Sequence, residues 1–183
     1  EALTHDIEAD ICVIGGGLAG LSTAMGLLEK GMKGVTLIEA NRIGWGASGR
    51  NGGFVAKGYA AGYRPLVKKV GLDHTRALHK LATKGRAQIK KRIENYNIDC
   101  EPVINGVLGV SWNNHPKSVR EYVDWMRESF NAPLEFWTKE QVHECCKTEQ
   151  YFEGFYSPED YQFHPLNYVH GLANAIENQG GKI

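Results

Sequence analysis

A strand, a glycine-rich turn and a helix open this chain, and their order constrains its fold more than any other feature. The apolar run ADICVI (9–14) lacks strict alternation, which is typical of a strand covered on both faces. GGGLAG (15–20) follows, and residues 18–30 carry apolar side chains at helical spacing. A second apolar run, VTLI (35–38), leads directly to Glu39. This succession predicts a Rossmann-type unit and therefore an α/β fold.

The glycines of the turn fit the pattern G-x-G-x-x-G, in which each has a separate task. Gly15 makes the tight turn, Gly17 lets the backbone approach a pyrophosphate, and Gly20 allows the helix to pack on the strand. The pyrophosphate is then expected at the positive end of the helix, beside Leu18 and Ala19. We therefore predict that a dinucleotide binds here, rather than that the turn has no ligand.

Glu39 and Ala40 lie at the predicted tip of the second strand, where an acid can accept hydrogen bonds from ribose hydroxyls. A carboxylate at this point repels a 2′-phosphate, which disfavours NADP. The acid and the glycine turn together form the predicted adenosine end of the site.

The segment GASGRNGG (46–53) distinguishes between the two remaining dinucleotides, NAD and FAD. It has four glycines in eight residues, and each glycine costs a helix ~1 kcal/mol, so the next covering helix of a plain NAD-binding fold is not expected here. Glycines do let a backbone run close to a large flat ligand, which suits FAD. The predicted cofactor contacts in this loop are Ser48, Gly49, Arg50, Asn51, Gly52 and Gly53.

Two interpretations of Arg50 stay open. It is either an ordinary surface arginine, or a cation close to the flavin ring or the phosphates that tunes the cofactor. Ser48 and Asn51 are expected to hydrogen-bond flavin or phosphate. We expect side chains at Gly49, Gly52 or Gly53 to collide with the cofactor or to require a positive φ.

These segments together resemble the family of FAD-dependent amine and D-amino-acid oxidoreductases, in particular its glycine-oxidase-like and gamma-glutamylputrescine-oxidase-like members. The resemblance rests on residues 9–31 and 35–53, and on GFYSP (154–158) with the helix between His164 and Gly180. It implies a glutathione-reductase-like FAD-binding domain with an inserted α+β substrate domain. It also implies oxidation of a C–N bond in an amine or amino acid by hydride transfer to flavin, followed by hydrolysis of the imine. Oxygen is the expected electron acceptor.

Some relatives attach the flavin covalently through a histidine in this loop. No histidine lies between Gly44 and Gly58, so we predict no such attachment here. No catalytic residue stands out in the chain.

The expected domains are a first FAD-binding part (1–96), part of an inserted substrate domain (97–156) and a return to the FAD-binding domain (157–183). Helices are expected at about 73–96 with a possible break at Gly85, and at 116–130, 138–146 and 165–179. Asn105-Gly106 predicts a hairpin turn between strands 101–104 and 107–112. Residues 134–137 predict a short strand, and 152–163 an extended segment broken at Ser157-Pro158. The final GGKI (180–183) predicts a helix end followed by a strand, so we expect the sequence to be incomplete at its C-terminus.

Composition excludes some classes of function. Lys plus Arg equals Asp plus Glu at 21 each, so the basic run 84–92 is interpreted as a solvated helix face and not as a nucleic-acid site. No apolar run approaches the ~20 residues of a membrane span. Four cysteines without a C-x-x-C pair favour a reducing, cytoplasmic compartment. His143, Cys145 and Cys146 lack a second ligand pair at zinc spacing, so we expect no metal.

The aromatic side chains near the end of the chain are interpreted as core rather than as a substrate cage. They are Tyr151, Phe152, Phe155, Tyr156, Tyr161 and Phe163. Two rival functions stay open, namely an NAD-dependent dehydrogenase and a non-catalytic FAD-binding module that needs a complementary chain.

Overall fold

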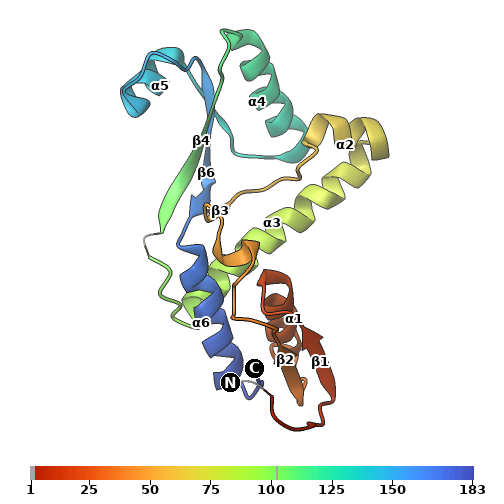
Figure 1. Ribbon diagram of the computed structural model, residues 1–183. Helices are drawn as coiled ribbons and strands as arrows, with labels where there is room; N and C mark the ends of the chain where they lie inside the picture. The colour runs from red at the N-terminus through yellow and green to blue at the C-terminus, as the bar shows by residue number, and fades with distance from the viewer. Residues whose placement is uncertain (1–2, 102) are drawn as a thin grey trace. The chain divides into compact units, whose positions relative to one another are not determined.

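The computed structural model describes residues 3–101 and 103–183, which form two compact units. Of these residues, unit 1 contains 3–53, 89–101 and 163–183, and unit 2 contains 54–88 and 103–162. These boundaries differ from the predicted ranges 1–96, 97–156 and 157–183. Residues 54–88 belong to unit 2, and residues 97–101 belong to unit 1. The two units are described separately below (Figure 1).

Unit 1 begins with the predicted βαβ succession. Strands β1 (Ile11–Ile14) and β2 (Val35–Ile38) pair in parallel, with Ile11 opposite Val35 and Ile14 opposite Ile38. Helix α1 (Leu18–Leu28) connects them and is two residues shorter than predicted. Lys182 forms a parallel bridge with Thr36, which confirms an extended segment after the last helix. The predicted α/β class is correct for unit 1.

The core of unit 1 lies where α1 contacts helix α6 (Pro165–Asn178). Leu21 and Met25 of α1 are fully buried, as are Leu172 and Ile176 of α6. These positions are three or four residues apart along each helix, so each helix turns one apolar face inward. This packing holds α1 against β2, and therefore fixes the direction in which the first turn of α1 points.

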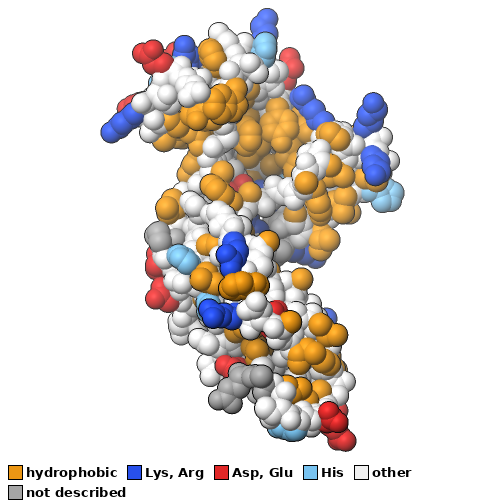
Figure 2. Space-filling model, viewed as in Figure 1, with side chains coloured by type: hydrophobic (Ala, Val, Ile, Leu, Met, Phe, Trp, Pro, Cys, Tyr) orange, Lys and Arg blue, Asp and Glu red, His pale blue; other side chains and the backbone are white. Residues whose placement is uncertain are grey.

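Strand β1 is less covered than predicted. Cys12 is exposed and 81% of Ile14 is accessible, so one face of the strand lacks cover within the described residues. Figure 2 shows hydrophobic side chains on the surface over the β1 and β2 part of unit 1. The expectation of a strand covered on both faces was wrong for this face.

Unit 2 is built on an antiparallel sheet whose central strand is β6 (Gly154–Gln162). Strand β4 (Ile104–Val110) pairs along one edge of β6, and β3 (Phe54–Val55) and β5 (Glu135–Trp137) pair with its two ends. Helices α2 (Tyr63–Val70), α4 (Pro116–Phe130) and α5 (Lys139–Cys146) belong to this unit. Helix α3 (Leu72–Asn95) is continuous through Gly85, so the possible break there is not observed.

The predicted hairpin at Asn105-Gly106 was wrong. Both residues lie within the single strand β4, and Pro102 of the predicted first arm lies outside the described residues. Asn105 pairs with Tyr161 and Val107 with Ser157, so the register shifts between them, and Gly106 has a φ of +85°. Three residues of β6 (158–160) lie opposite the single residue Gly106, so the extra residues of this irregularity are in β6. The Asn-Gly pair stays within a strand because its partner strand comes from about 50 residues further along the chain.

The predicted break at Ser157-Pro158 is present as a gap in pairing, since β6 runs through both residues but its pairs with β4 stop at Ser157 and resume at Tyr161. Pro158 lies in the part of β6 for which no pairing with β3, β4 or β5 is recorded, so its missing N–H is tolerated. The predicted start of α5 is correct. Thr138 and Gln141 form a capping box there.

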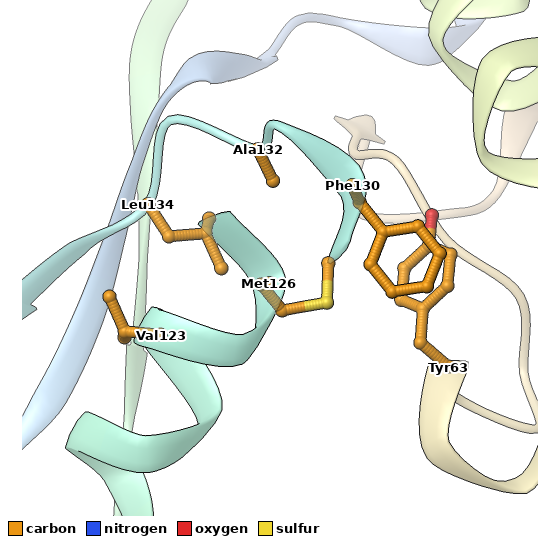
Figure 3. Close-up of a cluster of buried hydrophobic side chains, with 6 residues drawn as sticks. All are labelled: Tyr63, Val123, Met126, Phe130, Ala132 and Leu134. Carbon is orange, nitrogen blue, oxygen red and sulfur yellow. The ribbon is translucent and has the colours of Figure 1, made fainter. Parts of the chain in front are cut away.

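The core of unit 2 lies beneath α4 (Figure 3). Val123, Met126 and Phe130 project from α4 at helical spacing, and Tyr63 of α2 lies against Phe130 with their ring centroids 5.0 Å apart. Ala132 and Leu134 complete the cluster from the segment after α4. Among the described residues, no helix is long and apolar enough to cross a membrane.

Candidate functional site

The turn between β1 and α1 has the geometry that its glycines predict. Gly15 has a φ of +106°, and its N–H donates to the Ile38 carbonyl at 2.8 Å, which ties the turn to the end of β2. A Cβ on Gly20 would meet the carbonyl oxygen of Gly15, so only glycine lets α1 start this close to the turn. The turn and packing roles predicted for Gly15 and Gly20 are therefore confirmed.

The N-terminus of α1 is open to an anion. Gly17 is its N-cap and provides no side-chain cap, and the first helical turn contains no acidic residue. The N–H of Leu18 donates to Ser48 Oγ at 2.9 Å, and Ala19 is exposed. Backbone N–H groups and the helix dipole both favour negative charge at such an end. This arrangement can hold a phosphate group.

Glu39 lies at the end of β2, beside this turn. Its Oε2 accepts a hydrogen bond from Gly16 N at 2.6 Å, and its Oε1 accepts one from Asn41 N at 2.9 Å. The bond from Gly16, followed by that from Asn41, lowers the pKa of the Glu39 carboxyl. A carboxylate has about four acceptor positions, so both oxygens retain capacity for hydroxyl donors of a ligand. The neighbouring Ala40 is exposed.

The glycine-rich loop is attached to the same turn. Gly44 N donates to Gly16 O at 2.9 Å, and the short helix η1 (Ala47–Gly49) carries Ser48 to the start of α1. Ser48 thus accepts from Leu18, while its own hydroxyl hydrogen remains available for another acceptor. The loop therefore adds a side chain to the phosphate-binding end of the site.

Asn51 uses its amide group within the loop. Its Nδ2 donates to the carbonyls of Ala47 and Ser48 at 2.9 and 3.0 Å, and its Oδ1 accepts from Gly53 N at 2.8 Å. These three bonds hold the loop in one conformation. The structure thus shows Asn51 as a brace for the loop, and its predicted contact with a cofactor stays a prediction.

Arg50 is exposed and lies over the ring of Trp45. Its guanidinium carbon is 4.6 Å from the ring centroid, and its Nε donates to the Trp45 carbonyl at 2.7 Å. Arg42 approaches the same ring at 5.9 Å. The side chain of Arg50 is therefore held at the surface of unit 1 by a neighbour five residues away.

The protein's own packing accounts for two glycines of the loop. A Cβ on Gly49 would meet the carbonyl of Gly44, and a Cβ on Gly53, which has a φ of +70°, would meet the carbonyl of Phe163. The expected positive φ is therefore present at Gly53, and the clashes are with backbone atoms of this chain. Gly52 is exposed, and its predicted role at the cofactor stays a prediction.

Sequence reasoning missed the contacts that join the loop to the turn. Ser48 reaches Leu18 across 30 positions, and Gly44 reaches Gly16 across 28. The sequence offered one signal for the Ser48–Leu18 contact, namely a hydroxyl residue in a glycine-rich loop. Trp45 was also missed as the platform beneath Arg50.

The other residues singled out by the sequence belong to unit 2, except for Phe163 of unit 1. Tyr161 and Phe163 are buried, whereas the other four aromatic side chains of that cluster are half-buried. His143 lies with its Nε2 2.6 Å from the Tyr151 carbonyl, and Cys145 and Cys146 are exposed free thiols. Within residues 3–101 and 103–183, no group of three or more metal-ligating side chains is present.

Comparison with known proteins extends these observations. Residues 10–183 match the family model described as FAD dependent oxidoreductase. Gamma-glutamylputrescine oxidoreductase from Escherichia coli (strain K12) is 32% identical over 183 residues, which cover all of this chain and 43% of that protein. The chain therefore spans less than half of this relative's length.

Two solved structures are similar in fold. Glycine oxidase from Bacillus cereus ATCC 14579 superposes with a TM-score of 0.69 at 23% identity, over 96% of this chain and 46% of that one. L-amino acid deaminase from Proteus myxofaciens superposes with a TM-score of 0.74 at 19% identity, over 100% of this chain and 39% of that one. Because the family model covers nearly the whole sequence, the chain belongs to the family of FAD-dependent oxidoreductases.

Proposed function

We propose that the protein containing this chain is an enzyme that oxidises the C–N bond of an amine or an amino acid with FAD. The observation that carries the proposal is the position of Glu39, whose carboxylate is hydrogen-bonded to Gly16 of the glycine turn at 2.6 Å. This contact supports the proposal that Glu39 is a ribose-binding acid beside a phosphate-binding helix end. The family match over residues 10–183 supports FAD as the dinucleotide.

The residues of the turn fit the adenosine diphosphate part of FAD. We propose that the N–H groups of Gly17 and Ala19 face the pyrophosphate, and that Glu39 accepts from the ribose hydroxyls. Neither a side-chain cap nor an acid in the first turn of α1 opposes the negative charge. Ser48, already bonded to Leu18, is the proposed side-chain donor to the phosphates.

The loop 46–53 is proposed to run beside the remaining part of the cofactor. FAD, when bound, supplies the hydride acceptor for the oxidation. The loop residues keep a fixed shape through the three bonds of Asn51 and the packing of Gly53. The proposed task of this chain is thus to bind and orient the cofactor, and none of its described residues is proposed as catalytic.

The substrate class rests on the relatives. Their printed names include a gamma-glutamylputrescine oxidoreductase, a glycine oxidase and an L-amino acid deaminase, all of which refer to amine or amino-acid substrates. We propose the same class here, with imine hydrolysis after the oxidation and oxygen as the electron acceptor. The four described cysteines are free, which is consistent with the proposed cytoplasmic location.

The test uses the whole protein purified with its native ligand. Heat release followed by mass determination is expected to recover FAD, and the yellow absorbance is expected to bleach when an amine or amino-acid substrate is added without oxygen. Recovery of NAD would instead support a dehydrogenase. FAD that no amine or amino acid bleaches would support a non-catalytic FAD-binding module, and either result contradicts the proposal.

A further inference from the structure

Unit 1 contains a second concave site, a groove between α6 and the end of α3. Figure 1 shows the last turns of α3 next to α6. The groove has a volume of about 630 Å³, and its two walls come from residues 95–99 and 167–179. The glycine turn, Glu39 and the loop 46–53 are not among the described residues that line it. The groove is therefore distinct from the proposed FAD site.

The wall formed by α6 is polar because this helix has two different faces. Leu172 and Ile176 are fully buried on the face that belongs to the core. Asn167, Asn174 and Asn178 are three, four or seven residues apart when taken with the residues between them, so they lie on the opposite face of the helix. All three are exposed and line the groove. Helix α6 thus presents amide side chains to the groove.

The floor of the groove is made by a close approach of the two walls. A Cβ on Gly171 would meet the side chain of Ile98, so glycine lets the segment after α3 lie directly on α6. Ile98 and Ala175 line the groove and are 7% and 5% exposed, which places them deep in it. Tyr96 adds a ring whose hydroxyl donates to Glu29 Oε1 at 3.3 Å. The floor is therefore apolar and fixed in position.

The rim of the groove consists largely of carboxamide groups from both walls. Each carboxamide offers two N–H donors and a carbonyl acceptor without a charge. All of them are exposed, so a ligand in the groove can reach them. They belong to Asn95, Asn97, Asn167, Asn174, Asn178 and Gln179.

The charges of the groove disfavour an anionic ligand. None of the described residues that line it is Lys or Arg, and its titratable residues are Tyr96, Asp99 and His170. Helices α3 and α6 both end here, and the C-terminal end of a helix carries a partial negative charge. A phosphate or carboxylate would thus enter without an arginine or lysine partner. The carboxylate of Asp99 and the amide carbonyls instead suit hydroxyl donors.

We propose that this groove binds a neutral carbohydrate of two or three sugar rings. Sugar hydroxyls both donate and accept, which matches a rim of carboxamides, and the apolar floor can contact the C–H groups of a ring. The size agrees, because ~150 Å³ is sufficient for one six-membered carbon ring, and about 630 Å³ leaves room for several rings with their hydroxyls. The site requires no part of the cofactor, so the proposal is independent of the proposed function.

The test measures binding of maltotriose to the FAD-loaded protein by calorimetry. Saturable binding is expected, and Asn174→Ala on one wall or Asn95→Ala on the other should weaken it by about fivefold, the scale of one neutral hydrogen bond. Both positions are exposed on helices, where alanine is well tolerated. Glu177→Ala is the matched control, because Glu177 is exposed on α6 but is not among the residues that line the groove. Its affinity for maltotriose should equal that of the parent protein.

A crystal soaked in maltotriose provides a second measurement that does not depend on a variant. Density for sugar rings between Asn95 and Asn174 would support the proposal. Absence of saturable binding would overturn it, as would equal losses of affinity in the two asparagine variants and in Glu177→Ala. Tighter binding of acetyl-trialanine amide than of maltotriose would also overturn it, since the groove would then be a peptide site. A groove filled by another segment of the whole protein would overturn it as well.

Discussion

Unit 1 and unit 2 present their polar groups in opposite ways. At the turn of unit 1, the groups are backbone N–H donors, a carboxylate and the hydroxyl of Ser48, placed at the ends of β1 and β2. In unit 2, Ser157 and His79 are among the residues that line a mostly apolar cavity, and the charges of Arg86 and Asp160 beside it are paired. Backbone donors at a helix start suit an anionic ligand, whereas apolar walls with paired charges suit an uncharged one. The turn and the cavity therefore differ in the chemistry they can bind.

The largest expected effect is on the folding of the loop in unit 1. Gly53→Ala places a methyl group at a φ of +70° and against the Phe163 carbonyl. We expect it to lower the free energy of unfolding of the cofactor-free protein by about 2–4 kcal/mol. Denaturant unfolding checks this, with Gly46→Ala as the control, since a Cβ at Gly46 meets no atom within 4 Å. An equal loss in both variants would show that the loop is not held by this packing.

The next effect concerns the affinity of unit 1 for FAD. Glu39→Ala removes the proposed acceptor of the ribose hydroxyls and the acceptor of Gly16 N. The dissociation constant of FAD is expected to rise by about tenfold to hundredfold, measured by fluorescence titration of the stripped protein. Glu177→Ala, at an exposed position on α6, is expected to leave it unchanged. A similar dissociation constant for FAD in the two variants would show that Glu39 does not contact the cofactor.

How well the sequence predicts each unit depends on how far apart along the chain the contacting residues lie. Residues 11–38 lie close along the chain, so the strand, turn and helix of unit 1 were predicted within a few residues. Ser48 and Leu18 are 30 positions apart, and this bond was not predicted. In unit 2, Asn105-Gly106 favours a turn locally, but pairing with Tyr161 and Ser157 keeps it within a strand. The groove between α3 and α6 joins two distant segments, so no local pattern reveals it.

A pH titration tests the paired charges of unit 2. Hydrogen bonds from Arg86, then Lys57, lower the pKa of Glu159 from 4.5 to about 2. Because the folded pKa is below the ordinary value, the stabilisation is complete above about pH 4.5 and is lost as the pH falls toward 2. Glu159→Gln is expected to flatten the decrease in melting temperature over this interval, whereas Glu121→Gln on α4 is not. An unchanged slope in Glu159→Gln would show that this ion pair does not form in solution.

The smallest expected effect is at Arg50, which Trp45 holds at the surface of unit 1. Arg50→Lys keeps the charge but loses the planar guanidinium, so FAD should stay bound while its reduction potential shifts measurably. Potentiometric titration checks this, and Arg42→Lys is the control because Arg42 approaches the same ring. If Arg50→Lys leaves the reduction potential of FAD unchanged, whether or not Arg42→Lys shifts it, Arg50 does not act on the cofactor and only holds the loop.

The central claim is that the glycine turn, Glu39 and Ser48 hold the adenosine diphosphate part of FAD. A crystal structure of the FAD-loaded protein tests it most directly. We expect the pyrophosphate within hydrogen-bond distance of the N–H groups of Gly17 and Ala19 and of Ser48 Oγ, with ribose hydroxyls donating to Glu39. A ribose bound away from Glu39, or a pyrophosphate away from the start of α1, would contradict the account.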